Sequence, residues 1–214
     1  MRVAIGGGHG QIALRLARVL AERGDEARSL IRNADQADDV RATGAEPVVC
    51  DLEHASEDDV VAAIDGVDAV VFAAGAGPGS GPERKWTMDY GGAVKLIEAT
   101  KRAGIRRYVI VSSMGADANA PGDDTFAVYL RAKGRADDDL RASGLDYTVL
   151  RPGRLTTEPG SGRVALGENV DRGAISRDDV AQVLAALLHA PNAVGKTADL
   201  VAGDVPVADA VEAL

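Results

Sequence analysis

The sequence predicts an α/β fold, a Rossmann-like doubly wound parallel sheet of about six or seven strands with helices on both faces. The chain opens with an apolar strand, a glycine turn and a helix, and short apolar runs then alternate with amphipathic segments. Of its residues, 46% are apolar but 3% are aromatic. A core of Val, Leu, Ile and Ala suits a parallel sheet buried between helices. The length of 214 residues fits one domain over 1–214.

The first strand, Val3 to Ile5, leads into Gly6-Gly7-Gly8-His9-Gly10, and a helix opens at Gln11. From Gly7 the spacing is G-x-x-G-x-x-A, which permits a sharp turn and a close approach of phosphate oxygens to bare backbone. The free N–H groups and the dipole of the helix start favour an anion. We therefore predict a dinucleotide pyrophosphate site at this turn rather than a plain tight turn. Its expected residues are Gly7, His9, Gly10, Gln11 and Ile12.

The second strand, Ala27 to Ile31, ends at Arg32. An NAD site usually has a carboxylate near this point, to bind the ribose 2′-hydroxyl, and here there is none. A guanidinium suits a 2′-phosphate in charge and geometry. Arg32 therefore favours NADP over NAD, with an ordinary surface arginine as the alternative.

A polar helix over 34–43 precedes the third strand, Glu46 to Cys50. Asp51 and Leu52 follow this strand, where Asp51 could accept a hydrogen bond from an adenine amine and Leu52 could cover the ring. The alternative for Asp51 is a residue that caps the next turn. A further helix then begins, with Ser56 as its N-cap.

The fourth strand, 68–72, runs into Ala73, Ala74 and Gly75, whose small size would let a cofactor approach the backbone. A glycine-rich loop then leads to a long helix over 85–103. Helical spacing places Asp89 on or beside the buried stripe of that helix, although a surface acid is equally compatible.

The fifth strand, 107–111, ends in Ser112 and Ser113, and a helix over 126–143 follows. That helix carries Tyr129 and Lys133, one turn apart on one face. A lysine ammonium near a phenol lowers its pKa, which suits a tyrosine that acts as an acid–base. The position of this pair directly after the Ser-Ser strand favours a catalytic role over a chance spacing.

The last third of the chain supplies a sixth strand, 146–150, and a turn at 151–154. The stretch 155–173 reads as a loop, with a short strand pair expected at 164–165 and 174–175. Ser176 is expected to cap an apolar helix over 180–188. A strand over 198–201 and a helix over 207–214 complete the predicted elements.

Charge and composition exclude several classes of function. A net charge of −9 argues against binding to nucleic acid or anionic membranes, which require a basic face. The single cysteine, Cys50, permits no intramolecular disulfide and reads as a small buried hydrophobe. His54 and His189 have no ligand-type spacing, so no metal site is expected. No signal peptide or long apolar run is visible, and we expect a cytoplasmic protein, either a monomer or a homodimer.

Several motifs together resemble the atypical short-chain dehydrogenase/reductases of the NAD-dependent epimerase-like group. The resemblance extends from residue 2 to about residue 201. The matching segments are GGHGQIA at 7–13, IRN at 31–33, DL at 51–52, AAGAG at 73–77, MDYGGA at 88–93, VSSMGAD at 111–117, YLRAK at 129–133, ASGLDYTVLRPGRLT at 142–156 and ISRDDVA at 175–181.

The resemblance implies NADP along the carboxyl ends of the strands, with Tyr129 as the acid–base and Lys133 as its partner on the nicotinamide ribose. It gives Ser113 the role of positioning a substrate oxygen. Asp89 replaces the usual Asn, which puts the standard proton relay in doubt. Pro152 and Gly153 are further expected cofactor contacts. In place of a large C-terminal substrate domain, the loops 77–85 and 154–176 are expected to form a small pocket.

These features favour an NADP(H)-dependent oxidoreductase that acts on a small carbonyl, quinone-like or sugar-derived substrate. A nucleotide-sugar epimerase or dehydratase would use the same side chains. The alternative in which the protein is not an enzyme is an NADP-binding redox sensor, and the presence of Tyr129 and Lys133 disfavours it.

Overall fold

The computed structural model describes residues 1–77 and 79–214, and strands alternate with helices along them. The first half of the chain contains β1 (Arg2–Gly6), α1 (Gln11–Glu22), β2 (Glu26–Ile31), the 3₁₀ turn η1 (Ala34–Gln36), α2 (Ala37–Arg41), β3 (Glu46–Val49), α3 (Glu57–Ala63), β4 (Ala69–Phe72), α4 (Pro82–Arg84), the π-helix η2 (Lys85–Gly92), α5 (Ala93–Arg102) and β5 (Arg107–Val111). The second half contains α6 (Thr125–Ala142), β6 (Asp146–Pro152), β7 (Arg154–Thr156), β8 (Arg163–Gly167), β9 (Ala174–Ser176), α7 (Arg177–Leu188), the 3₁₀ turn η3 (Pro191–Ala193), β10 (Lys196–Ala202), β11 (Val205–Pro206) and α8 (Val207–Glu212).

The central sheet confirms the predicted fold class. Its strand order within the described residues is β11-β8-β10-β6-β5-β4-β1-β2-β3. The strands from β3 to β10 run parallel, and the order 3-2-1-4-5-6 is that of a doubly wound dinucleotide-binding sheet. The order reverses between β1 and β4, and ligands bind such sheets at the carboxyl ends of the strands beside this point.

The sheet has nine strands in the described part of the chain, more than the predicted six or seven. The difference arises in the stretch that reads as a loop, because β8 pairs antiparallel with β10 and β11 pairs with β8. The predicted pairing of 164–165 with 174–175 is wrong. Instead β9 pairs in parallel with β7 in a separate two-stranded ladder, at the register Leu155–Ile175.

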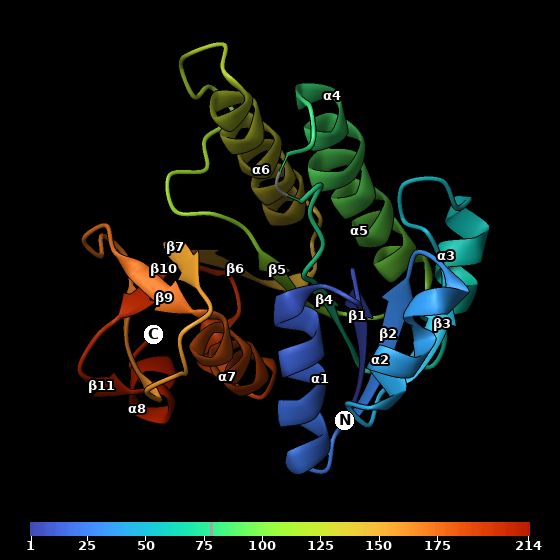
Figure 1. Ribbon diagram of the computed structural model, residues 1–214, viewed down its shortest axis with the longest axis horizontal. Coiled ribbons are helices and arrows are strands. Elements are labelled where there is room, and N and C mark those ends of the chain that lie inside the picture. Colours follow the sequence, from blue (N-terminus) through green and yellow to red (C-terminus); the bar gives the residue numbers. More distant parts are fainter. Residues whose placement is uncertain (78) are drawn as a thin grey trace.

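Helices cover both faces of the sheet (Figure 1). One face packs against α1, α7 and α8, and the other against α3, α5 and α6. Serine caps hold two of these helices as predicted, since Ser56 Oγ accepts a hydrogen bond from the Asp59 N–H and Ser176 Oγ accepts one from the Asp179 N–H. None of the described helices is long and apolar enough to cross a membrane.

The predicted helix over 85–103 is not uniform. It begins with the π-helical segment η2 and continues as the α-helix α5. Gly91 and Gly92 lie at the junction, where their low helix propensity weakens a regular α-helical ladder. Asp89 lies within this π-helical segment and is buried, and π-helical segments are frequent at functional sites.

Candidate functional site

A cavity of about 170 Å³ lies at the carboxyl ends of β1, β2 and β4. Nine of the residues predicted to bind the cofactor line this cavity: Gly7, His9, Gly10, Arg32, Asp51, Leu52, Ala73, Ala74 and Gly75. Gln11 and Ile12 start α1 beside it but are not among its lining residues. The strand ends thus bring together side chains from four separate segments of the sequence.

The glycine turn leaves bare backbone facing this cavity. Gly7 has φ +77°, and a Cβ there would lie 2.6 Å from Ala74 Cα. Gly10 is the N-cap of α1, its φ is −67°, and it makes no side-chain capping bond. The first turn of α1 also carries no acidic residue, so its N–H groups face no built-in anion. The turn therefore has the shape and the donors that a pyrophosphate requires.

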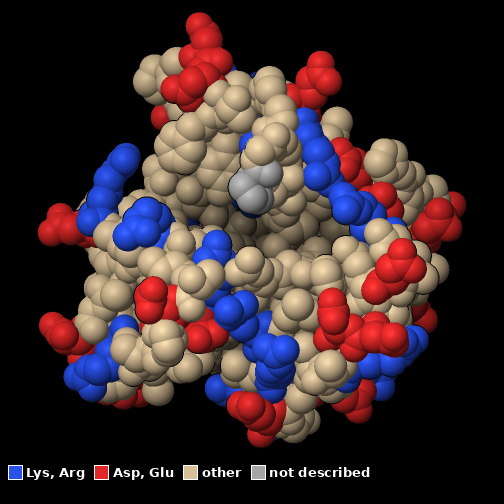
Figure 2. Space-filling view, in the orientation of Figure 1, with Lys and Arg blue, Asp and Glu red and all other residues tan. Residues whose placement is uncertain are grey.

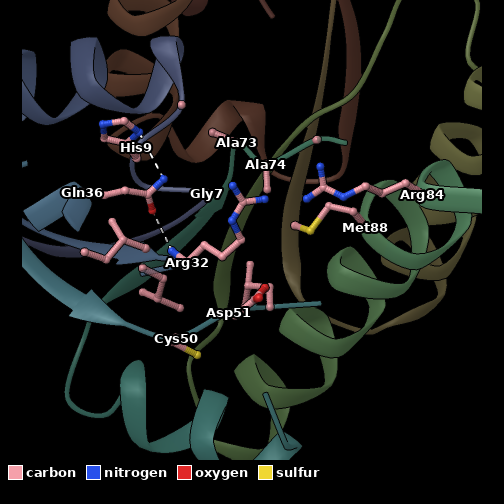
Figure 3. Close-up of a pocket in the computed structure, with 15 residues that line it drawn as sticks. Gly7, His9, Arg32, Gln36, Cys50, Asp51, Ala73, Ala74, Arg84 and Met88 are labelled. Carbon is pink, nitrogen blue, oxygen red and sulfur yellow. Dashed lines mark hydrogen bonds between the residues drawn. The ribbon is translucent and has the colours of Figure 1, made fainter. Parts of the chain in front are cut away.

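Arg32 extends into the same cavity at the end of β2 (Figure 3). Its backbone N–H donates to Gln36 Oε1 at 2.9 Å, and Gln36 Nε2 lies 3.3 Å from His9 Nδ1. His9 Nε2 lies 2.8 Å from Asp39 Oδ2 on α2. His9 is therefore held at the rim by side chains beyond the glycine turn. Gln36 also lines the cavity but was not predicted from the sequence. It belongs to the capping box of η1, and no local pattern indicates its contact with His9.

Arg84 and Met88 enter the cavity from the opposite side and were also missed (Figure 3). Arg84 Nε donates to Glu53 Oε2 at 3.1 Å, and its Nη1 donates to the Ala76 carbonyl at 3.0 Å. Burial alone would raise the pKa of Glu53, but hydrogen bonds from Thr87 and Arg84 outweigh it and hold that pKa below its usual value. Arg84 lies within the predicted loop 77–85, and Pro78 of that loop falls outside the described residues.

Asp51 and Cys50 occupy the floor of this cavity (Figure 3). Burial would raise the pKa of Asp51, yet bonds from His54 and from the Glu53 N–H keep it below its usual value. Cys50 is buried as predicted, and burial raises the pKa of its thiol. The thiol is therefore protonated at neutral pH and acts as a small apolar wall.

Asp51, Glu53 and His54 place one potential metal-ligand atom each within 4.8 Å of one another. Sequence spacing did not indicate this grouping. His54 Nδ1 already lies 2.9 Å from Asp51 Oδ2, and Glu53 is engaged by Arg84. All three side chains are thus already engaged by contacts within the protein.

A second cavity, of about 550 Å³, lies at the carboxyl ends of β5 and β6. Its lining residues are Ser113, Met114, Phe126, Tyr129, Pro152, Gly153, Arg154, Leu155, Arg172 and Gly173. Predicted catalytic and cofactor residues thus meet here, as the family resemblance implies. Since β4 and β5 are neighbours, the two cavities follow one another along the same edge of the sheet. Figure 2 shows a hollow in this face, with Lys and Arg side chains along its border.

Tyr129 lies in the wall of the second cavity between aromatic and cationic neighbours. Its ring stacks on Phe126 with centroids 6.0 Å apart. Lys85 Nζ lies 5.7 Å from the Tyr129 ring centroid and Lys133 Nζ lies 6.0 Å from it. Lys85 was not predicted near Tyr129 from the sequence, because Lys85 belongs to a different segment, η2. The Lys85 ammonium also donates to Ser80 Oγ at 2.8 Å. The tyrosine therefore has two ammonium groups near its ring.

Lys133 and Asp89 lie beneath the cavities rather than in their walls. The Lys133 ammonium donates to the Val111 carbonyl at 3.0 Å and lies 3.6 Å from Asp89 Oδ1. Asp89 Oδ2 accepts a hydrogen bond from the Ala76 N–H at 3.1 Å. The acid predicted at the relay position is thus a buried counter-ion that links Lys133 to the segment after β4.

A second buried network supports the strand ends beside the second cavity. Asp137, one turn beyond Lys133 on α6, accepts hydrogen bonds from Ser112 Oγ at 2.9 Å and from Arg151 at 2.8 Å. Burial raises the pKa of Asp137 despite the Arg151 charge. The network joins the residue before Ser113 to the residue before Pro152, and so fixes both sides of the cavity mouth.

Comparison with known proteins identifies a family for this chain. A family model described as NAD(P)H-binding matches residues 7–191. A Bacillus subtilis protein named uncharacterized sugar epimerase YhfK is 40% identical over 215 residues, and the match covers 100% of both chains. The similarity therefore includes both cavities as well as the glycine turn.

Two solved structures share the architecture over nearly their full length. A Bacillus halodurans protein, provisionally named NAD-dependent epimerase/dehydratase, is 38% identical with a TM-score of 0.93 and full coverage of both chains. The Lactococcus lactis oxidoreductase ylbE is 25% identical with a TM-score of 0.86, covering 100% of this chain and 96% of that one. Both likenesses span the sheet and the segments around it.

Proposed function

The chain belongs to the NAD(P)H-binding family, and on that premise we propose that it is an NADP(H)-dependent oxidoreductase acting on a small carbonyl, quinone-like or sugar-derived substrate. One observation carries the proposal. The cavity that contains Ser113 and Tyr129 adjoins the cavity formed by the glycine turn, along one edge of the sheet. A reactive group and a dinucleotide site would then face the same substrate.

The residues of the first cavity fit a dinucleotide. The bare backbone at Gly7 and Gly10 would hold the pyrophosphate, and the start of α1 would add its free N–H groups. Arg32 would bind a 2′-phosphate, which favours NADP. When bound, the nicotinamide supplies the hydride chemistry.

The chain itself would supply the proton and orient the substrate. Tyr129 would donate its phenolic proton to the substrate oxygen, since it lies in the wall of the second cavity. Ser113, whose Oγ has a single long contact of 3.4 Å to the Met114 carbonyl, is able to donate to the same oxygen. Lys133 and Lys85 place positive charge near the tyrosine ring.

Replacement of the tyrosine by phenylalanine tests this assignment. We expect Tyr129→Phe to lower the rate of NADPH oxidation with a panel of carbonyls and quinones by about 100-fold or more, because the proton donor is lost. NADPH affinity, measured by fluorescence titration, should stay near the wild-type value. Tyr147→Phe, in β6 and outside both cavities, serves as the matched control. Wild-type turnover in the Tyr129 variant would contradict the assignment.

An epimerase is the second candidate, because a full-length relative that is 40% identical carries the name of a sugar epimerase. Such an enzyme would return the hydride to its own substrate and retain its cofactor. Interconversion of nucleotide-sugar epimers, with no net change in absorbance at the nicotinamide band, would support it. Net consumption of NADPH with a free carbonyl substrate would support the reductase.

A further inference from the structure

The second cavity contains a pair of arginines that the proposed chemistry does not use. Arg154 and Arg172 line it together with Ser113 and Tyr129. Neither guanidinium makes an ion pair or a side-chain hydrogen bond among the residues that the structure describes. The described lining also contains no Asp or Glu. Two cations without counter-ions thus face the space next to the predicted acid–base.

The backbone holds these arginines close to each other. Arg154 begins β7 and Arg172 precedes β9, and the two strands pair in a parallel ladder. The Arg154 N–H donates to the Gly173 carbonyl at 2.9 Å, while a side chain at Gly153 would collide with that same carbonyl. The glycines next to each arginine therefore allow the two segments to touch, and both arginines line the same cavity.

Arg172 also reaches the loop that follows the catalytic serine. A Cβ at Gly115 would lie 3.4 Å from Arg172 Nη2, so the guanidinium lies over a residue two positions beyond Ser113. The pair is therefore close to the place where a substrate oxygen would be polarised.

The position of the pair in a cavity sets it apart, rather than its lack of partners alone. An exposed arginine such as Arg18 also makes no ion pair or side-chain hydrogen bond among the described residues, but it lines neither cavity. Acidic residues outnumber basic ones by 33 to 24, and several arginines are paired with carboxylates, such as Arg15 with Asp178. In the first cavity Arg84 is likewise neutralised by Glu53. In an acidic protein, two guanidinium groups that lack such partners favour the recognition of an anion.

We propose that the substrate is an organic acid, with a carboxylate or phosphate group bound by Arg154 and Arg172 and an apolar body packed against Met114, Phe126 and Leu155. A guanidinium donates two parallel hydrogen bonds to either type of group, and apolar walls favour a flat hydrocarbon body. The inference rests on the proposed function, because it assigns the substrate class of the same site. The anionic end would fix the orientation in which the reacting oxygen faces Ser113 and Tyr129.

Equilibrium binding of three probes with the same ring system tests the proposal without turnover. The probes are 2-naphthoate, 2-naphthyl phosphate and the uncharged 2-naphthamide, titrated by calorimetry into the full chain with saturating NADP⁺. The cofactor keeps the probes out of the first cavity. We expect at least one of the two acids to bind about 10- to 100-fold more tightly than the amide, as charge-assisted hydrogen bonds would give. The tighter of the two acids identifies the preferred group.

The variant Arg154→Gln/Arg172→Gln should remove this preference and leave amide binding unchanged. Arg18→Gln is the matched control, because Arg18 is exposed on α1 and lines neither cavity. Equal affinity for acids and amide in the wild type, no acid binding at millimolar concentration, or an unaltered preference in the double variant would overturn the proposal. Tyr129→Phe separates it from the proposed function, since that variant should lose turnover and still bind the acid.

Discussion

The ammonium of Lys133 lies 3.6 Å from the carboxylate of Asp89, and the two side chains are 4% and 1% exposed. The pair joins α6 to η2 directly beneath the candidate site. A buried charge that loses its partner is costly, whereas an exposed pair contributes little. We therefore interpret Asp89 as the counter-ion of Lys133, at a position where a carboxylate in place of the usual Asn puts the standard proton relay in doubt.

We expect Asp89→Ala to lower the free energy of unfolding by about 3 kcal/mol, because Lys133 would be left buried without its counter-ion. Asp89→Asn should lose less, since its amide oxygen can still accept the Ala76 N–H. Urea denaturation of both variants measures the difference.

Asp138→Ala is the control for this prediction. It breaks the exposed pair of Asp138 with Arg141 on the same helix, α6, and should cost less than about 1 kcal/mol. If Asp89→Ala were no more destabilising than this control, Asp89 would not be needed as the counter-ion of Lys133.

Local sequence patterns predicted those parts of the site that depend on one segment at a time. The glycine turn could be identified because strand, glycines and helix are consecutive, and Arg32 because it directly follows β2. Helical periodicity placed Asp89 on or beside the buried stripe but left a surface acid equally compatible, because the buried partner of the carboxylate, Lys133, lies on a different helix.

Long-range pairing was beyond local patterns. The β7–β9 ladder brings Arg154 next to Gly173, and no spacing in the sequence indicates that contact. The same holds for Arg84, which lines the first cavity and pairs with Glu53, 31 residues away. Both lie in segments that read as loops, where the sequence has no periodicity to follow.

The two N-cap glycines Gly10 and Gly81 allow a matched test of the phosphate site. Both have φ −67°, so alanine is compatible with each backbone. A Cβ at Gly10 would lie 3.1 Å from the Gly7 carbonyl oxygen, so the turn must shift by a few tenths of an ångström to admit it. We expect Gly10→Ala to bind NADPH about 10- to 100-fold more weakly, because the methyl group would crowd the turn where the phosphate is expected. Gly81→Ala, where nothing lies within 4 Å of the added methyl, should bind as the wild type does. Fluorescence titration with NADPH gives both values, and equal affinities would contradict a phosphate at Gly10.

Arg32 should set the preference between the two nicotinamide cofactors. We expect Arg32→Ala to raise the Kd for NADPH by about 10- to 100-fold and to change the Kd for NADH little, because only NADPH has the 2′-phosphate. Arg18→Ala, an exposed arginine outside both cavities, is the control. A parallel loss of affinity for both cofactors would assign Arg32 to another part of the dinucleotide.

Glu53 should make stability depend on pH near the first cavity. Burial raises the pKa of Glu53, but hydrogen bonds from Thr87 and Arg84 lower it by more than burial raises it. The pKa of this carboxyl is therefore lower in the folded protein than in the unfolded chain. Its stabilising contribution is therefore complete above the ordinary glutamate pKa of 4.5 and decreases as the pH falls through the lower folded pKa.

The difference in unfolding free energy between wild type and Glu53→Gln should be constant from pH 6 to 8 and should shrink below about pH 4.5. Glu83→Gln is the control variant, because it removes an exposed carboxylate of α4 that has no ion pair among the described residues. If the difference in unfolding free energy between wild type and Glu53→Gln grew as the pH fell, the Arg84–Glu53 pair would not have the stabilising role given to it.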